Sequence, residues 1–195
     1  MHVQRLLGAP LLLMLLACRS GDAADEITVR RINVVDEKGV VRFVIAGDAP
    51  DPILRGQRYP RAVSPAAILW HDEDGNESGG LAVAPLPDGR TMRMITFDFT
   101  VQPTDAVRIG TFESPDGERW MAGFEAFDRN PHLPGPIETS QGVRRIVLGT
   151  ENAQAGLTIL DPQERERIRI GVDAKGTAVF EILDESGAVV FRAPD

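Results

Sequence analysis

The densest group of side chains that could carry chemistry lies between residues 70 and 80. Its oxygen ligands, Asp72, Asp74, Asn76 and Glu77, fall within one short segment around Gly75. Ca²⁺ takes about six to eight oxygen ligands, so a tight turn bearing these groups could supply part of a calcium site. Glu77 occupies the position at which the EF-hand loop requires Gly, so the match is partial. Acidic hairpin turns that are simply hydrated are commoner, so we expect no cofactor, and a Ca²⁺ site is the alternative.

The same segment suggests a hydrolytic hypothesis. His71 would act as the base, Asp98 or Glu77 would orient it, and Ser78 would be the nucleophile. Ser78 lacks the strand-to-helix turn that exposes an activated serine, because it follows a hairpin and no helix pattern comes after it. We therefore favour a non-catalytic protein, with an envelope hydrolase that uses His71 as the alternative.

The elements that must position these residues are hairpins. A four-residue turn opened by Asp or Ser and closed by Gly recurs at residues 36–39, 72–75, 114–117, 173–176 and 184–187. The first side chain accepts a hydrogen bond from the backbone two residues on, and the Gly takes the positive φ that joins two twisted strands. Residues 161–164 fit the same turn, and a short helix that begins with Pro162 is the alternative.

The flanks of these turns alternate between apolar and polar residues with a period of two, which is typical of strands. Ile168, Ile170 and Val172 alternate in this way with Arg167, Arg169 and Gly171. No segment has an amphipathic helical pattern of useful length. The sequence predicts a single all-β, antiparallel domain of about 10–12 strands joined by DxxG hairpin turns, rolled into a barrel or folded as a sandwich.

Two long connections interrupt the hairpins. Residues 47–65 and 128–142 are rich in proline, and both exceed the usual connection of about 4–6 residues. Long ordered loops often carry function, although a surface insertion is the alternative. We expect a binding site, if there is one, around 47–65, 71–80 or 128–142.

The N-terminal residues have the pattern of an export signal. One positive charge at Arg5 precedes an apolar run of about a dozen residues, which is too short to cross a bilayer. Leu15-Leu16-Ala17-Cys18 resembles the lipobox of bacterial lipoproteins, and Cys18 is the only cysteine. We expect a signal peptide over 1–17, lipidation of Cys18, a tether over 18–26 and the β domain over 27–195. The alternative is cleavage after Ala23, which would release a soluble periplasmic or secreted protein.

Composition and charge exclude other classes. The 195 residues carry 21 Lys and Arg against 29 Asp and Glu, for a net charge of −8, and no basic run is long enough to follow a row of phosphates. We expect no nucleic-acid partner. The expected partners are the membrane, through the N-terminal lipid, and an envelope protein or small ligand.

Four segments together resemble a family of uncharacterised exported bacterial proteins. They are RINVVD at residues 31–36 with Gly39 and Arg42, HDEDGNESGGL at 71–81, Thr96-Phe97-Asp98, and the closing hairpins over 167–190. The resemblance covers most of the chain after the leader, and the chain departs from the family at Phe99-Thr100. The family lends no activity, so the resemblance implies only an exported, β-rich protein.

Overall fold

The computed structural model describes residues 25–100, 104–129 and 142–194, and all regular structure within these ranges is β. None of these residues belongs to a helix of the length and hydropathy that a membrane span requires. The leader, Cys18 and most of the 128–142 connection lie outside the described residues. The strands are β1 (Arg31–Val35), β2 (Val41–Ala46), β3 (Ile53–Leu54), β4 (Gln57–Arg58), β5 (Ala66–His71), β6 (Glu77–Pro85), β7 (Thr91–Asp98), β8 (Asp105–Glu113), β9 (Trp120–Asp128), β10 (Val143–Glu151), β11 (Gln154–Leu160), β12 (Glu166–Val172), β13 (Ala178–Leu183) and β14 (Val189–Ala193).

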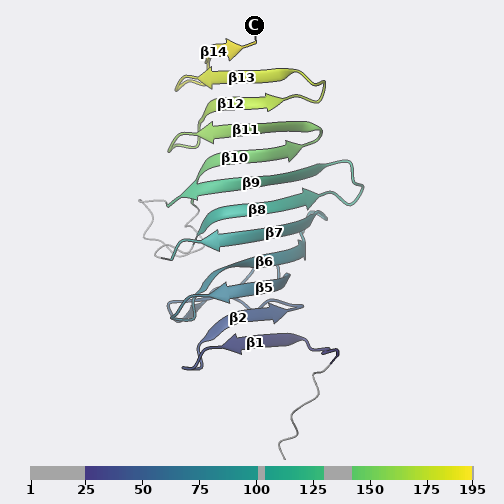
Figure 1. The fold of residues 1–195 in the computed structure, drawn as a ribbon, viewed down its shortest axis with the longest axis vertical. Helices are drawn as coiled ribbons and strands as arrows, with labels where there is room; N and C mark the ends of the chain where they lie inside the picture. The colour runs from purple at the N-terminus through teal and green to yellow at the C-terminus, as the bar shows by residue number, and fades with distance from the viewer. Residues whose placement is uncertain (1–24, 101–103, 130–141, 195) are drawn as a thin grey trace, which may run out of the picture.

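Twelve of the strands form one antiparallel sheet in which almost every strand pairs with its neighbours along the chain (Figure 1). The order is β1-β2-β5-β6-β7-β8-β9-β10-β11-β12-β13-β14, and β3 pairs with β4 in a separate hairpin. The predicted all-β, antiparallel domain with hairpin turns is confirmed. The sheet is open, with β1 and β14 as its edges, so a closed barrel is not formed.

The hairpin turns are formed as the sequence predicted. At each of the five DxxG or SxxG turns the Gly has a φ between +73° and +86°, and its N–H donates to the carbonyl of the residue that opens the turn. In the 184–187 turn, for example, Oδ1 of Asp184 accepts the N–H groups of Ser186 and Ala188. Residues 161–164 also form a turn rather than a helix, with Glu164 at a φ of 58° in the place of Gly.

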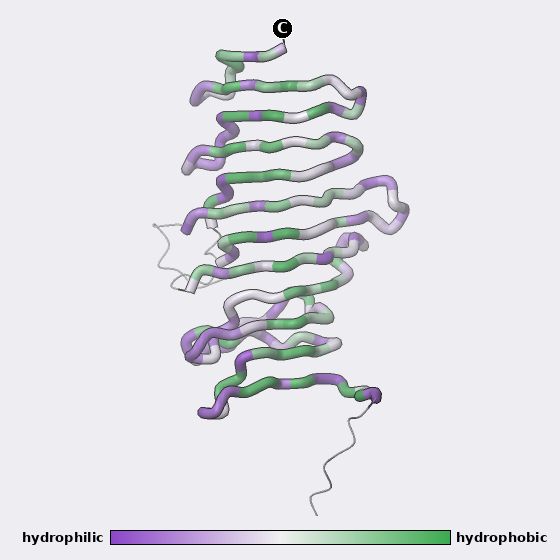
Figure 2. The backbone as a smooth tube through the Cα atoms, in the orientation of Figure 1, coloured by the Kyte–Doolittle hydropathy of each residue, from purple (hydrophilic) through white to green (hydrophobic). Residues whose placement is uncertain are grey.

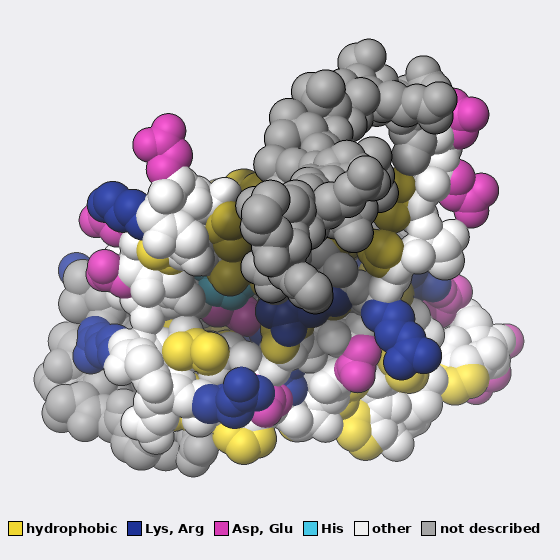
Figure 3. Space-filling model, turned by 90° about the horizontal axis from the view of Figure 1, so that it is seen from below, with side chains coloured by type: hydrophobic (Ala, Val, Ile, Leu, Met, Phe, Trp, Pro, Cys, Tyr) yellow, Lys and Arg dark blue, Asp and Glu magenta, His cyan; other side chains and the backbone are white. Residues whose placement is uncertain are grey.

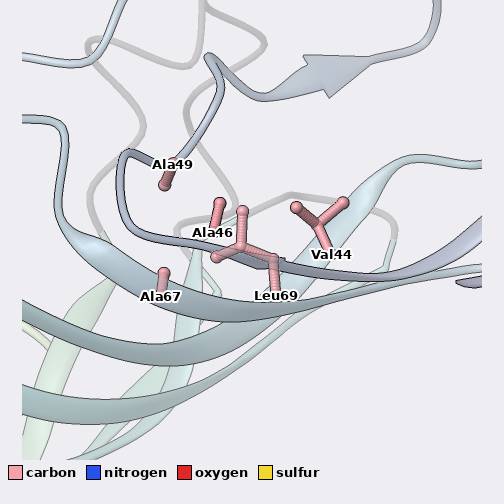
Figure 4. Close-up of a cluster of buried hydrophobic side chains, with 5 residues drawn as sticks. All are labelled: Val44, Ala46, Ala49, Ala67 and Leu69. Carbon is pink, nitrogen blue, oxygen red and sulfur yellow. The ribbon is translucent and has the colours of Figure 1, made fainter. Parts of the chain in front are cut away.

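A cluster of buried apolar side chains lies under the excursion between β2 and β5. Val44 and Leu69, on neighbouring strands, are 1% and 3% exposed and contact Ala46, Ala67 and Ala49 (Figure 4). Ala49 belongs to the excursion, and its N–H donates to the carbonyl of Pro65 at 2.8 Å. Residues 47–65, with the β3–β4 hairpin, thus form a second layer over one end of the large sheet. The described part of the chain is layered in the manner of a sandwich only at this end.

One face of the sheet carries an apolar band that crosses all twelve strands. Because directly paired residues point to the same face, the register defines two uninterrupted cross-strand rows, which we call the apolar stripe. The first row is Val34, Phe43, Trp70, Gly79, Phe97, Val107, Ala126, Ile146, Ile159, Ile168, Ile182 and Phe191. The second row is Ile32, Ile45, Ile68, Leu81, Ile95, Ile109, Phe124, Leu148, Leu157, Ile170, Phe180 and Ala193. Apolar residues accordingly fill the strands and hydrophilic residues the turns (Figure 2).

The opposite face carries charged pairs and small residues, together with large apolar residues such as Val44 and Leu69, which the excursion covers. Arg108 of β8 pairs with Glu125 of β9, and Arg169 of β12 pairs with Glu181 of β13. The two faces therefore differ in chemistry, and the face with the charged pairs contains the groove described below.

Candidate functional site

The Asp72 carboxylate of the acidic turn accepts its hydrogen bonds from other residues of the same turn. Oδ1 of Asp72 accepts the N–H groups of Asp74 at 3.0 Å and Asn76 at 2.8 Å, and Oδ2 accepts Nδ2 of Asn76 at 2.9 Å. Burial acts to raise the pKa of Asp72, but the hydrogen bonds from the Asn76 side chain and from the backbone hold it below its usual range. The Asp72 carboxylate therefore serves first to fix the hairpin.

Two of the other three oxygen ligands of the predicted calcium set, Asn76 and Glu77, bind the excursion. Oδ1 of Asn76 accepts the N–H of Arg55 at 2.5 Å, and the Glu77 carboxylate forms an ion pair with Arg61. Among the described residues, no group of three or more His, Cys, Asp or Glu side chains is placed to hold a metal ion. Calcium binding at Asp72, Asp74, Asn76 and Glu77 stays a prediction.

The three residues of the hydrolytic hypothesis are near one another in the sheet but have separate contacts. The hydroxyl of Ser78 donates to the carbonyl of Trp70 at 3.4 Å, not to His71. Nδ1 of His71 is buried and has no hydrogen-bond partner in the described part of the chain. Burial lowers the pKa of His71, and a backbone hydrogen bond with Arg42 acts in the opposite direction. No hydrogen bond joining Ser78 to His71 is formed within residues 25–100.

Asp98 lies instead in a buried acidic cluster. Burial, together with the nearby Asp105 and Glu77 carboxylates, raises the pKa of Asp98 to about 7 against the opposing effect of Arg61. Burial also raises the pKa of Glu77 against the effect of Arg61. Asp105, which the sequence analysis did not single out, pairs with Asp98 across β7 and β8 and is itself bound by Nε of Arg108 at 2.9 Å. The Asp98, Asp105 and Glu77 carboxylates thus repel one another at the end of β7.

A second candidate site lies on the opposite face from the apolar stripe. Its floor is a ladder of glycines, each directly paired with the next across five consecutive strands, β8 to β12: Gly110, Gly123, Gly149, Gly156 and Gly171. A Cβ at Gly149 would lie 2.4 Å from the carbonyl oxygen of Ala122, and one at Gly171 would lie 2.6 Å from that of Ala155. Side chains are therefore excluded along this line by the backbone of the adjacent strand.

The glycine ladder lies at the bottom of a groove of 430 Å³. Since strands are about 4.8 Å apart, five paired glycines extend for about 19 Å across the sheet. The residues two positions away on each strand form the sides. One side of the groove consists of Arg108, Glu125, Val147, Thr158 and Arg169. The other side of the groove consists of Phe112, Met121, Glu151, Gln154 and Asp173.

The sides of the groove present charged groups on a nearly apolar floor. Nη1 of Arg108 donates to Oε2 of Glu125 at 3.0 Å, and Nη1 of Arg169 donates to Oε2 of Glu181 at 3.3 Å. Hydrogen bonds from Arg192 hold the pKa of Glu181 below its usual range. The backbone of the floor is already paired in the sheet, so a ligand would meet Cα–H groups below and polar side chains at its edges.

The groove leaves a signal in the sequence. Each of the strands β8 to β12 carries one glycine in its interior, where glycine is unfavourable unless another group approaches closely. Five such strands in succession indicate a line across the sheet that is kept bare. The sequence analysis did not single out these glycines.

Comparison with known proteins gives no identification, because the chain matches no protein-family model and no curated protein significantly. Positive and negative side chains are interspersed on the face shown in Figure 3, so that face has no continuous basic surface. The candidate function therefore depends on the geometry of the groove.

Proposed function

We propose that this protein is a non-catalytic binding domain held at the bacterial cell envelope, and that the groove over the glycine ladder receives an elongated, polyhydroxylated ligand such as a sugar chain. The observation that carries the proposal is the unbroken line of five paired glycines, which keeps about 19 Å of sheet surface free of side chains.

The chemistry of the groove favours a sugar chain over an acyl chain. A sugar ring has an apolar C–H face that suits the glycine floor, and hydroxyl groups at its edge that suit carboxylates, guanidinium groups and amides. Glu125 and Arg108 stand on one side, and Glu151, Gln154 and Asp173 on the other. An acyl chain would offer no hydrogen bond to Glu151 or Gln154, and desolvating unpaired polar groups is unfavourable.

Lipid attachment at Cys18 is the second part of the proposal. A chain with an excess of acidic residues is repelled by anionic lipid, so a covalent lipid would hold the domain at the membrane. Intact-mass analysis of the protein from the membrane and soluble fractions tests this part. A diacylated Cys18 terminus supports it, and an unlipidated terminus at Ala24 would show a freely diffusing exported protein.

Titration calorimetry with chitotetraose, cellotetraose and maltotetraose tests the binding site. We expect saturable binding of at least one of them with a Kd below about 1 mM. Thr158→Phe, which places a ring in the groove, should weaken that binding at least tenfold. Thr111→Phe makes the same change on the opposite face and is the matched control.

Two results would overturn the assignment of the groove. One is the absence of binding by all three sugars, which would remove the ligand class. The other is sugar binding that Thr158→Phe leaves intact, which would place the site elsewhere on the protein.

A further inference from the structure

We infer that two copies of this chain pack face to face through the apolar stripe, forming a two-layered β-sandwich. The stripe is an apolar surface of the described residues that the groove does not explain. It consists of two cross-strand rows that run from edge to edge of the sheet, and none of its positions carries a charge. The inference is independent of the groove, which lies on the other face.

The exposure of the stripe is unusual for a protein surface. Thirteen of its large side chains are 37–52% exposed, and they include Phe43, Phe97, Ile109, Leu148 and Phe191. Neighbours within the sheet cover only their flanks. Isolated exposed apolar residues are common, but continuous apolar patches beyond a few hundred Å² mark interaction surfaces.

The area of the stripe matches what a stable dimer needs. With about 200 Å² for a whole large side chain, the exposed part of these thirteen residues amounts to roughly 1,200 Å² per copy. A standard protein interface buries about 800 Å² per partner. Since strands are about 4.8 Å apart, the stripe extends for about 53 Å, and a second copy offers an apolar surface of the same length.

Charge favours a second copy over a membrane as the occupant. The turns at the ends of the strands carry carboxylates, among them Asp36, Asp74, Asp161 and Asp184, and the chain has a net charge of −8. Laying the stripe on a bilayer would bring these turns to the lipid headgroups. In a face-to-face pair the stripes meet about 10 Å apart while the turns stay in water on both sides.

Aromatic contacts within the stripe support a preformed surface. The rings of Trp70 and Phe97 have centroids 5.3 Å apart, and those of Phe180 and Phe191 have centroids 5.6 Å apart in an edge-to-face arrangement. Nε1 of Trp70 donates to the carbonyl of Ser78 at 3.2 Å, which holds its ring. A rigid apolar surface loses little side-chain entropy on association.

Sedimentation equilibrium of the Cys18→Ser chain tests the inference, since this chain has no lipid that could hold copies together. We expect twice the monomer mass at micromolar concentration, and a melting temperature that rises with protein concentration. Leu148→Lys puts a charge at the centre of the stripe and should weaken association at least 100-fold. Val190→Lys is the control, because Val190 is 63% exposed but lies outside both rows.

Three results would overturn the inference. The first is a monomer mass at 100 µM with a melting temperature independent of concentration, and this result requires no variant to fold. The second is a dimer that Leu148→Lys leaves unchanged. The third is a monomer that binds uncharged phosphatidylcholine vesicles and loses this binding in Leu148→Lys, which would assign the stripe to the membrane. Thr158→Phe should leave the mass unchanged, so the dimer and the groove are tested separately.

Discussion

Replacing Asp98 by Asn should stabilise the protein at neutral and alkaline pH. Oδ1 of Asp98 is buried without a hydrogen-bond partner in the described residues, and Asp105 and Glu77 place two further carboxylates nearby. Arg61 acts to lower its pKa but is already paired with Glu77. Asn has the same shape as Asp and no charge to desolvate, so it removes the unfavourable interaction and keeps the packing.

The magnitude follows from the pKa of Asp98. Its pKa is about 7 in the folded protein against an ordinary value of 3.8. Between these pH values the folded state keeps a proton that the unfolded state has released, so the free energy of unfolding falls as the pH rises. The shift of about three units corresponds to roughly 4 kcal/mol at about 1.4 kcal/mol per unit. Above pH 7 this stability is lost in the wild type but not in Asp98→Asn.

Urea unfolding between pH 4.5 and 8 measures the effect. The stability of Asp98→Asn relative to the wild type should increase by about 2–4 kcal/mol across this range. Asp48→Asn, at an exposed carboxylate, should show no such change. A difference between Asp98→Asn and the wild type that stays constant from pH 4.5 to 8 would refute the proposed electrostatic strain. His71 is present in both proteins, so its contribution cancels.

Three further predictions concern packing and titration, and urea or thermal unfolding measures all of them. Leu69→Ala should cost about 2–5 kcal/mol because Leu69 is 3% exposed, whereas Leu81→Ala, at 37% exposure, should cost less in the monomer. Gly149→Ala should destabilise the protein by more than about 2 kcal/mol, because the new Cβ would lie 2.4 Å from a carbonyl oxygen. Gly176→Ala should destabilise it by only about 1–2 kcal/mol, because the Cβ would enter open space and only the φ of +86° is unfavourable. Equal costs for the two variants would contradict the close approach at Gly149. The free energy of unfolding of His71→Asn should exceed that of the wild type most near pH 5, because there the unfolded wild type binds a proton that buried His71 does not bind in the folded state. This difference should disappear above pH 7. A difference independent of pH would show that His71 titrates normally.

The local structure was predictable because it depends on residues close together in the sequence. The Asp at the start of each turn and the Gly at its end interact over four or five residues, so the positions of the hairpins at 36–39, 173–176 and 184–187 follow directly from the chain. Alternation with a period of two specifies the strands in the same way, and consecutive hairpins imply a meander. Short-range chemistry therefore determined the all-β class and nearly every turn.

The candidate chemistry was less predictable because it depends on partners distant in the sequence. The sequence placed Ser78 and His71 together, but the hydroxyl of Ser78 is bound to the Trp70 carbonyl across the strand pair. It placed Glu77 in a calcium set, but the excursion brings Arg61 to that carboxylate. The Ser78 contact depends on the register of the β5–β6 strand pair, and the Glu77 contact depends on how the 47–65 segment folds over the sheet.

By itself, the sequence determined that this protein is a β meander with an N-terminal export pattern, because turns and alternation are local properties. Only the tertiary structure decided which residues lie together on each face of the sheet. Pairing in register converts single apolar residues on twelve strands into one stripe, and single glycines on five strands into the floor of one groove. A shift of one residue in any strand would move its side chains to the opposite face, so the register, which only the folded sheet has, creates both surfaces.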